Sequence, residues 1–256
     1  MDIVVIGSGN VAHYFSHILR LNGHQIRQVL SRKEEHARVL AEKLNTVWAT
    51  DLIDIDMNAD VYLLAVNDSA ISDLNKELHL GKRIVAHTAG AVPLNAIEDI
   101  SVNTGVIYPL QSIRKGIHFN YGIPLLIEAG NEMVLKRLHA LADIISDKVI
   151  EMDSVSRLKM HLAAIFCNNF TNHLISLCKK YCEDETLDFS LLHPLMKETF
   201  HRLENINPDE LQTGPAIRGD EETMLKHLYL LKSYPEMRKI YQLLSESIEK
   251  FSLNQA

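Results

Sequence analysis

Short apolar runs rich in β-branched residues alternate with amphipathic stretches over the first 152 residues of the chain. This alternation is typical of a parallel β-sheet whose strands are joined by crossover helices. We expect strands at 2–6, 26–31, 61–66, 83–87, 104–108, 123–129 and 148–152. The spacing predicts a helix between the first two strands, from about Asn10 to Leu21, with Gly23 placed to end it.

After Met152 the β-branched runs disappear and helical periodicity continues to the last residues. The pattern predicts helices at about 155–181, within 187–205, from 208 to near 214, from about 221, and from 235 to about 251. We therefore place a domain boundary at this point. Residues 1–152 form an α/β domain and residues 153–256 form an all-helical domain.

Composition and charge exclude some classes of protein. The chain has 256 residues, 46% of them hydrophobic, and a net charge of -7 without a clustered basic excess, which argues against nucleic-acid binding. No leader and no apolar segment near the roughly 20 residues of a membrane span is recognised. We expect a soluble, cytoplasmic protein that binds no membrane. Its three cysteines suit reduced thiols, and Cys178, Cys182 and His173 lack the spacing of a metal site, so no metal is expected.

The motif GSGNVA at 7–12 matches G-x-G-x-x-G/A, directly after the first predicted strand and at the start of a predicted helix. Gly7 permits a tight turn, Gly9 allows the backbone to approach a pyrophosphate, and Ala12 allows close helix packing. Amide groups at the helix start favour an anion. We expect cofactor contacts from Gly7, Ser8, Gly9, Asn10 and Val11. The alternative is a glycine turn that binds no ligand.

The end of the second strand distinguishes NAD from NADP. An NAD enzyme commonly has an acidic residue there to bind the ribose 2′-hydroxyl, whereas this chain has Ser31, Arg32 and Lys33. A guanidinium can make a charge-assisted contact to a 2′-phosphate. We therefore predict NADP, bound by Ser31 and Arg32. The alternative is that the two cations only begin a solvated helix.

Two further strand ends are expected to face the same crevice. Val66 and Asn67 follow one strand, and His87 and Thr88 end the next, so we expect these four residues to contact the nicotinamide half of the cofactor. The alternatives are that Asn67 begins a helix cap and that His87 is satisfied by its own loop.

These motifs resemble a known family of Rossmann-type NADP oxidoreductases. IGSGNVA, LSR, AVNDSAI and HTAGAVP are similar to the N-terminal domains of deazaflavin-dependent NADP oxidoreductases and pyrroline-carboxylate reductases. KMHLAAIFCNNFTNHL at 159–174 and TGPAIRGD at 213–220 resemble a domain of unknown function that commonly follows such a module. The resemblance implies a doubly wound, mostly parallel sheet, a helical domain like that of phosphogluconate dehydrogenases, and a homodimer whose helical domains complete the cleft.

Polar residues on the long predicted helix are the candidates for chemistry. His161, Asn168 and Asn172 are spaced by seven and four, which places them on one face of an α-helix. Related dehydrogenases use a lysine and an asparagine one turn apart on the matching helix, but here Lys159 is followed four later by Ala163. We therefore expect His161 to exchange the proton and Asn168 to orient the substrate. The alternative is a buried hydrogen-bonding role at a dimer seam.

Two loops add further candidates. Glycines flank Arg218 in the loop at 213–220, which suits presentation of its guanidinium to a carboxylate or phosphate, although Asp220 could instead hold it in a structural loop. Asp220 itself is the expected cap of the next helix. The segment 108–112 is expected to be a Pro-fixed turn, with Gln111 as a possible contact to nicotinamide or substrate.

The sequence predicts an NADP-dependent oxidoreductase that transfers a hydride between nicotinamide and a small carbonyl, imine or alcohol substrate. The alternative is a non-catalytic NADP-binding dimer that acts as a sensor or assembly protein. A methyltransferase with the same kind of glycine turn fits less well, because Arg32 suits a phosphate.

Overall fold

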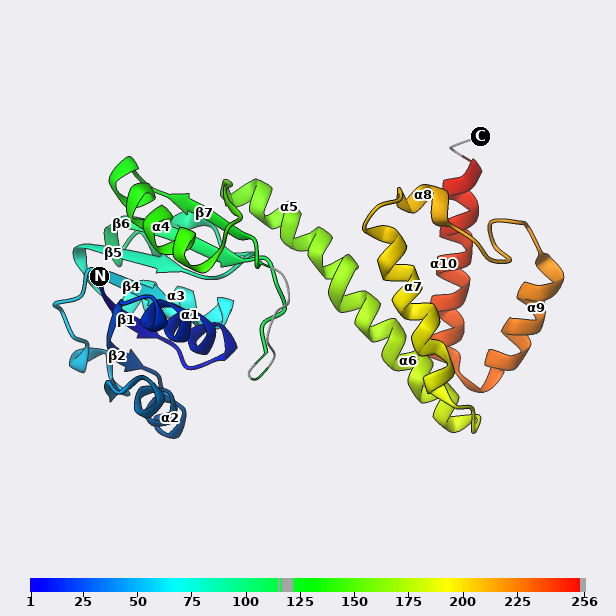
Figure 1. Ribbon diagram of the computed structural model, residues 1–256, viewed down its shortest axis with the longest axis horizontal. Helices are drawn as coiled ribbons and strands as arrows, with labels where there is room; N and C mark the ends of the chain where they lie inside the picture. Colours follow the sequence, from blue (N-terminus) through cyan, green and yellow to red (C-terminus); the bar gives the residue numbers. More distant parts are fainter. Residues whose placement is uncertain (115, 117–121, 254–256) are drawn as a thin grey trace. The chain divides into compact units, whose positions relative to one another are not determined.

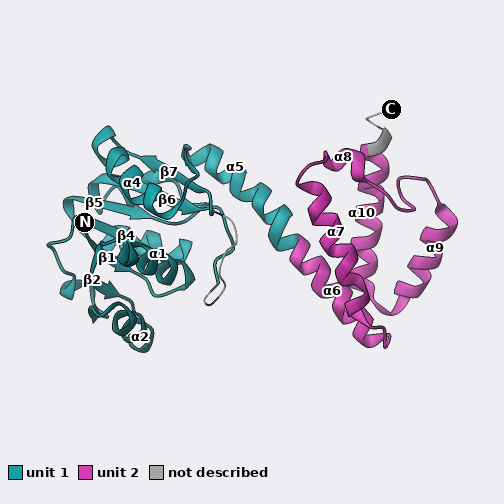
Figure 2. Ribbon diagram, in the orientation of Figure 1, with its two compact units in different colours: residues 1–170 teal, residues 171–256 magenta. Residues whose placement is uncertain are grey.

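The computed structural model describes residues 1–114, 116 and 122–253 of the chain. Its contacts divide the chain into two compact units, Met1–Phe170 and Thr171–Ala256 (Figure 2). The sequence boundary at residue 152 marks a different feature, the end of the sheet. The two divisions therefore differ in where they place the first turns of the long helix.

The described residues of unit 1 form an eight-stranded sheet in the order β3-β2-β1-β4-β5-β6-β7-β8 (Figure 1). The strands are β1 (Asp2–Ile6), β2 (Gln25–Leu30), β3 (Val47–Ala49), β4 (Val61–Leu64), β5 (Gly81–His87), β6 (Ser101–Pro109), β7 (Leu125–Ala129) and β8 (Val149–Glu151). All neighbours are parallel except β6 and β7. The predicted Rossmann-type sheet is confirmed, and the short edge strand β3 is an element that the pattern did not predict.

Alternate residues of β1 pack into two cores on opposite faces of the sheet. Ile3 and Val5 belong to a core that includes side chains of the helices α1, α2 and α4, whereas Val4 and Ile6 belong to one that includes α3 and the 3₁₀-helix η2. A strand covered on both faces needs apolar side chains at every position. This is why the strands read as continuous apolar runs.

Most helices of unit 1 lie between successive strands in the chain, and α5 and η3 follow the last strand (Figure 1). They are α1 (Asn10–Leu21), α2 (Glu34–Leu44), η1 (Leu52–Asp54), α3 (Asp68–Glu77), η2 (Leu94–Ile97), α4 (Glu132–Ile145), α5 (Ser154–Ala164) and the π-helix η3 (Ile165–Phe170). Asp153 caps α5, because its side chain accepts a hydrogen bond from the Ser156 amide at 2.8 Å. The prediction of one uninterrupted α-helix over 155–181 is wrong at 165–170, where the wider π turn replaces the α-helical one.

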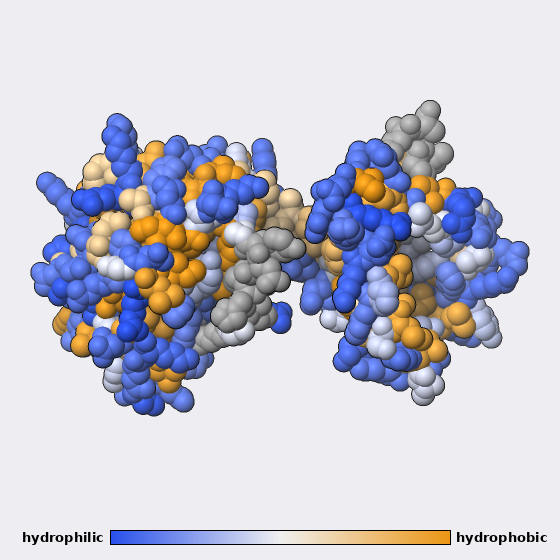
Figure 3. Space-filling view, viewed as in Figure 1, coloured by the Kyte–Doolittle hydropathy of each residue, from blue (hydrophilic) through white to orange (hydrophobic). Residues whose placement is uncertain are grey.

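The regular elements in the described part of unit 2 are all helices, as predicted. Its helices are α6 (Thr171–Asp184), η4 (Phe189–Leu192), α7 (His193–Leu203), α8 (Pro208–Leu211), α9 (Glu221–Leu230), η5 (Leu231–Ser233) and α10 (Pro235–Leu253). Among its described hydrophobic residues, only Cys182, Ala216 and Leu231 are buried, and others reach the surface (Figure 3). Within the described ranges, none of the helices of either unit has the length and apolar character needed to cross a bilayer.

Candidate functional site

The residues predicted to bind a cofactor lie at one edge of the sheet. Strand β1 pairs with β2 on one side and with β4 on the other, so the crossovers on its two sides run in opposite directions. Ligands of such sheets bind at this switch point, outside the carboxyl ends of the strands. The predicted residues follow or end these strands: Gly7, Ser8, Gly9, Asn10 and Val11 after β1, Ser31 and Arg32 after β2, Val66 and Asn67 after β4, and His87 and Thr88 at β5.

The first glycine of the turn is required by the packing of the protein itself. Gly7 has a φ of +121°, and a Cβ at this position would lie 2.1 Å from the Ala65 carbonyl oxygen of the neighbouring strand end. Its N–H donates to the Leu30 carbonyl at 2.7 Å, and the Ser8 and Ser31 hydroxyl oxygens are 2.8 Å apart. The turn is therefore fixed to the ends of both β2 and β4.

The second glycine lies in a different environment. A Cβ added to Gly9 would meet no protein atom within 4 Å. Gly9 is the N-cap of α1, which has no side-chain cap and no acidic residue in its first turn. By contrast, Asn131 caps α4 through its side chain, and Glu132 lies in the first turn of that helix. Since the helix dipole favours negative charge, the start of α1 is suited to an anion that the protein's own side chains do not supply.

The end of β2 carries positive charge. Arg32 and Lys33 are exposed, and Lys33 is the N-cap of α2 without a side-chain hydrogen bond. No salt bridge joins Arg32 to another residue in the described part of the chain. Its predicted contact with a ligand phosphate stays a prediction.

The ends of β4 and β5 differ in what their side chains can offer a ligand. Asn67 is exposed and is the N-cap residue of α3, yet its side chain makes no cap hydrogen bond. Thr88 is buried, and its hydroxyl donates to the Leu64 carbonyl at 3.3 Å. Val66 lies next to the glycine turn, because its Cγ1 is 3.3 Å from the Cβ position of Gly7.

His87 is completely buried. Its Nδ1 accepts a hydrogen bond from the Ala89 N–H at 3.2 Å, which favours the alternative that this residue supports its own loop. Burial is the main cause that lowers the pKa of His87 to about 4; the Arg157 cation adds to this, and the Pro93 backbone acts in the opposite direction. His87 is therefore a neutral ring at neutral pH, and its contact with a cofactor stays a prediction.

His161 meets a residue that the sequence argument missed. Its Nδ1 lies 2.9 Å from the hydroxyl oxygen of Tyr108, near the end of β6, and the two rings meet edge to face. Both residues pack against Gly90, in the loop after β5. The sequence signal that could have indicated Tyr108 as a candidate was its position at the end of a predicted strand. The neighbouring Gln111 is exposed and its side chain accepts from the Ser112 amide at 2.8 Å, which supports the interpretation of this segment as a turn.

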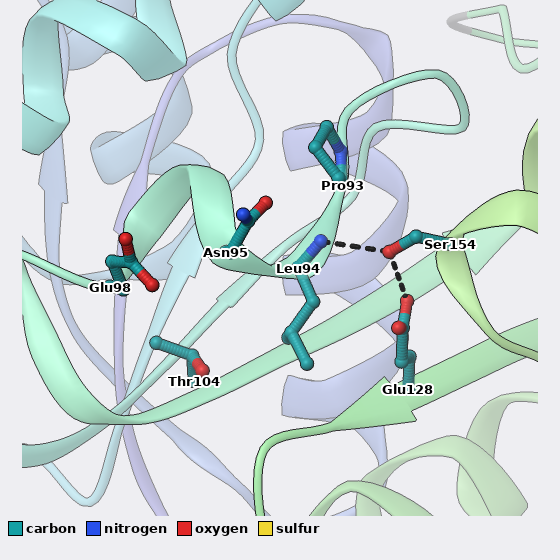
Figure 4. Close-up of a pocket in the computed structure, with 7 residues that line it drawn as sticks. All are labelled: Pro93, Leu94, Asn95, Glu98, Thr104, Glu128 and Ser154. Carbon is teal, nitrogen blue, oxygen red and sulfur yellow. Dashed lines mark hydrogen bonds between the residues drawn. The ribbon is translucent and has the colours of Figure 1, made fainter.

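A buried ion pair connects the first turns of α5 to the sheet. Arg157 is 1% exposed and donates to Glu128 of β7 and to the Val92 carbonyl, the latter at 2.6 Å. Ser154 donates to the same carboxylate at 2.8 Å and accepts from the Leu94 amide at 2.9 Å (Figure 4). This network links β7, the loop after β5 and α5, the helix that carries His161.

A shallow hollow of about 390 Å³ opens beside this network. It is lined by Pro93, Leu94, Asn95, Glu98, Thr104, Glu128 and Ser154 (Figure 4). None of the predicted cofactor or catalytic residues lines it. The hollow is therefore a feature separate from the predicted cofactor residues.

The remaining candidates are not brought to His161 by any recorded contact. Asn168 is exposed on the π-helix η3, and Asn172 belongs to α6 in unit 2. The predicted common face required an unbroken α-helix, so the spacing argument does not hold across 165–170. Arg218 is an exposed loop residue of unit 2, and Asp220 caps α9 as predicted, accepting from the Thr223 amide at 3.1 Å.

Comparison with known proteins identifies the family. Residues 2–90 match the protein-family model "NADP oxidoreductase coenzyme F420-dependent", and residues 123–248 match the domain of unknown function DUF2520. No curated protein matches the chain. A crystal structure from Bacteroides fragilis, named a "putative NADP oxidoreductase", is 37% identical over 97% of this chain and 98% of that one, with a TM-score of 0.91.

Two more distant structures share the fold over nearly the full length of both chains. A Thermotoga maritima protein is 22% identical over 99% of each chain, with a TM-score of 0.73. The 1-pyrroline-5-carboxylate reductase of Streptococcus pyogenes is 15% identical over 98% of each chain, with a TM-score of 0.65. From the two matched domains and the identity to the B. fragilis protein, the chain belongs to the NADP oxidoreductase family in which a Rossmann-type domain is followed by a DUF2520 domain.

Proposed function

We propose that this chain is an NADP-dependent oxidoreductase that transfers a hydride between nicotinamide and a small carbonyl, imine or alcohol substrate. The observation that carries the proposal is the glycine turn at the switch point of the sheet. Gly7 is required by a close backbone approach, while the space beside Gly9 and the uncapped start of α1 fit a pyrophosphate.

The charge at the end of β2 supports NADP over NAD. Ser31, Arg32 and Lys33 occupy the place where an acidic residue would bind a ribose 2′-hydroxyl, and the Arg32 guanidinium suits a 2′-phosphate. Asn67 and Thr88 follow the next two strands along the same edge. We assign them to the nicotinamide half of the cofactor.

The bound dinucleotide would supply the hydride, and the protein's own side chains would handle the proton and the orientation of the substrate. His161 exchanges the proton, because an imidazole can do so near neutral pH. Asn168 is the proposed orienting residue and Arg218 the proposed partner of an anionic group. The substrate class follows that of the pyrroline-carboxylate reductase with the same fold, whose name denotes an imine.

We also propose that the protein is a homodimer. Unit 2 buries few of its described hydrophobic residues, and large side chains such as Leu191, Leu195 and Tyr229 are 75%, 63% and 76% exposed. The exposed apolar side chains lie on several helices of unit 2, which is a larger surface than a bound short peptide would bury. Closed two-fold dimers are the commonest oligomers. We therefore propose that a second copy of the chain covers this apolar surface.

Titration calorimetry with NADPH and NADH tests the cofactor. We expect NADPH to bind more tightly, and Arg32→Gln to weaken NADPH by about 10- to 100-fold while leaving NADH unchanged, as for the loss of a charge-assisted hydrogen bond. Arg38→Gln is the matched control, because it removes an exposed arginine of α2 that pairs with Glu42. Equal affinity for the two cofactors, or a preference for NADH, would contradict the NADP assignment.

Turnover tests the reaction. NADPH oxidation would be followed with a panel of keto acids, aldehydes and cyclic imines that includes 1-pyrroline-5-carboxylate. We expect at least one to be reduced, and His161→Gln to lower kcat by about 100-fold or more, the usual size of a general-acid effect. Binding of NADPH without any turnover would favour a non-catalytic NADP-binding sensor, and a full rate in His161→Gln would remove the role of His161.

A further inference from the structure

We propose that Tyr108 is the positioning residue of His161: its hydroxyl donates to Nδ1, so that Nε2 is the ring nitrogen left to exchange a proton with the substrate. This inference rests on the proposed oxidoreductase function and assigns to it a residue from a different strand. Gly90 is the third part of the arrangement, because it provides the space in which the pair lies.

Contacts from three separate segments support the assignment. The Tyr108 hydroxyl oxygen and His161 Nδ1 are 2.9 Å apart, with ring centroids 5.8 Å apart at 76°. A Cβ at Gly90 would lie 2.7 Å from Cζ of the tyrosine and 2.9 Å from Nδ1 of the histidine. The pair is thus held between the loop after β5, the end of β6 and helix α5. The ends of β5 and β6 belong to the edge of the sheet where the predicted cofactor residues lie.

The hydrogens that the two groups carry favour the tyrosine hydroxyl as the donor. A tyrosine hydroxyl has one hydrogen, and Tyr108 is half-buried, with His161 as its only recorded hydrogen-bond partner among the described residues. If Nδ1 carried the hydrogen instead, the hydroxyl hydrogen would be left without an acceptor, which costs free energy in a half-buried place. Burial raises the pKa of Tyr108, Asp68 adds to the rise and Arg157 opposes it, so the hydroxyl keeps its hydrogen.

The consequence for His161 is a fixed ring. With Nδ1 occupied by the hydroxyl, the neutral ring carries its hydrogen on Nε2, and the ring cannot turn over without breaking the bond. Helix α5 is itself anchored through Arg157 to Glu128 of β7. Two attachments, one through the ring and one through the helix, therefore hold Nε2 in one direction.

Nuclear magnetic resonance of the full-length protein with ¹⁵N-labelled histidine rings reads the tautomer directly. The His161 signals are assigned by their absence in His161→Gln, at about pH 8, above the ordinary titration of histidine. We expect a single Nε2–H tautomer in the wild type and a mixture of both tautomers in Tyr108→Phe. Gly90→Ala is expected to have the same effect, because the added methyl displaces two side-chain ends and leaves the backbone in place.

The chain offers a matched control. In unit 2 the His227 Nδ1 of α9 lies 2.9 Å from the Tyr241 hydroxyl of α10, and these rings also meet edge to face. Tyr241→Phe removes the same kind of hydroxyl from the same kind of pair. We expect it to change the tautomer of His227 and to leave both the tautomer of His161 and kcat unchanged.

Kinetics gives a second measurement. With whichever substrate the panel identifies, Tyr108→Phe should lower kcat by about tenfold, a fraction of the general-acid effect, with the KM for NADPH within about twofold of the wild type. An Nδ1–H tautomer in the wild type, or an unchanged tautomer in Tyr108→Phe, overturns the positioning role. If no substrate is reduced, the proposed function fails, and the tautomer measurements still decide whether Tyr108 orients His161.

Discussion

The two glycines of the turn after β1 lie in different surroundings. At Gly7 the backbone angle and the Ala65 carbonyl exclude any larger residue, so the protein needs glycine there in order to fold. At Gly9 no protein atom competes for the space of a Cβ, so packing does not require glycine there, and the proposed pyrophosphate would use the open space. One residue thus serves the fold, and the other leaves room for the proposed cofactor.

Gly7→Ala should be strongly destabilising. The substitution combines a left-handed backbone with a Cβ 2.1 Å from a carbonyl oxygen, and we expect a loss of about 3 kcal/mol or more in the free energy of unfolding. Gly23→Ala is the control, because Gly23 has a φ of +81° but open space around its Cβ position, and it should cost about 1 kcal/mol. Urea unfolding measures both, and equal losses would contradict the role of the Ala65 contact.

His87 should make stability depend on pH. Its folded pKa is about 4 and an unfolded histidine titrates near 6.5, so in this interval the unfolded chain binds the proton more readily. Its contribution to stability is therefore complete above about pH 6.5 and falls by about 3 kcal/mol as the pH drops through 4. Comparing unfolding near pH 7 and pH 4.5, we expect a smaller pH dependence in His87→Gln than in the wild type, and identical slopes would refute this.

At the scale of the elements, a buried ion pair is one of the contacts that attach α5 to the sheet. The Arg157 and Glu128 side chains are 1% and 17% exposed, and Ser154 shares the same carboxylate. Leaving a buried carboxylate without its cation is costly, whereas removing both charges is much less so. The position of the helix that carries His161 is thus set by contacts with β7 and with the loop after β5.

Arg157→Met should lower the free energy of unfolding by about 3–5 kcal/mol, and adding Glu128→Gln should recover part of that loss. Denaturant unfolding of the single and double variants forms the cycle. Arg38→Met is the comparison, because its pair with Glu42 is exposed, and it should cost less than about 1 kcal/mol. A double variant no more stable than Arg157→Met would show that the two charges do not act as a pair.

At the scale of the whole molecule, the two units differ in how much of a core they contain. Unit 1 holds one layer of buried side chains on each face of its sheet, whereas the described part of unit 2 buries only three hydrophobic residues. A unit with so little core gains stability when another surface covers it. The proposed second copy of the chain would provide that surface.

Leu195→Glu should shift the protein from dimer to monomer. Leu195 is a 63% exposed residue of α7, and a charge at an apolar interface opposes its burial. Sedimentation velocity measures the shift, and circular dichroism shows whether the helices remain. Ile53→Glu is the control, because Ile53 is 86% exposed on unit 1 and its substitution should leave the dimer intact. A monomeric wild type at micromolar concentration would refute the dimer.

Local patterns were enough to predict most of the fold. The strand runs, the helix at Asn10–Leu21 and its stop at Gly23 depend on backbone sterics and on apolar spacing within a few residues, and the structure shows them at nearly the predicted positions. The three-residue strand β3 and the π turn at 165–170 escaped prediction, because neither has a periodic signal of its own.

The sequence by itself determined the sheet, the glycine turn, the lack of an acid after β2 and the helical second half. Only the tertiary structure decided that His87 is buried, that Arg157 anchors α5, and that Tyr108 meets His161 across 53 positions of sequence. The physical reason is the distance along the chain over which each kind of interaction acts. Backbone preference and side-chain period are set by near neighbours along the chain, whereas a contact between strand and helix exists only once the order of the strands has brought them together.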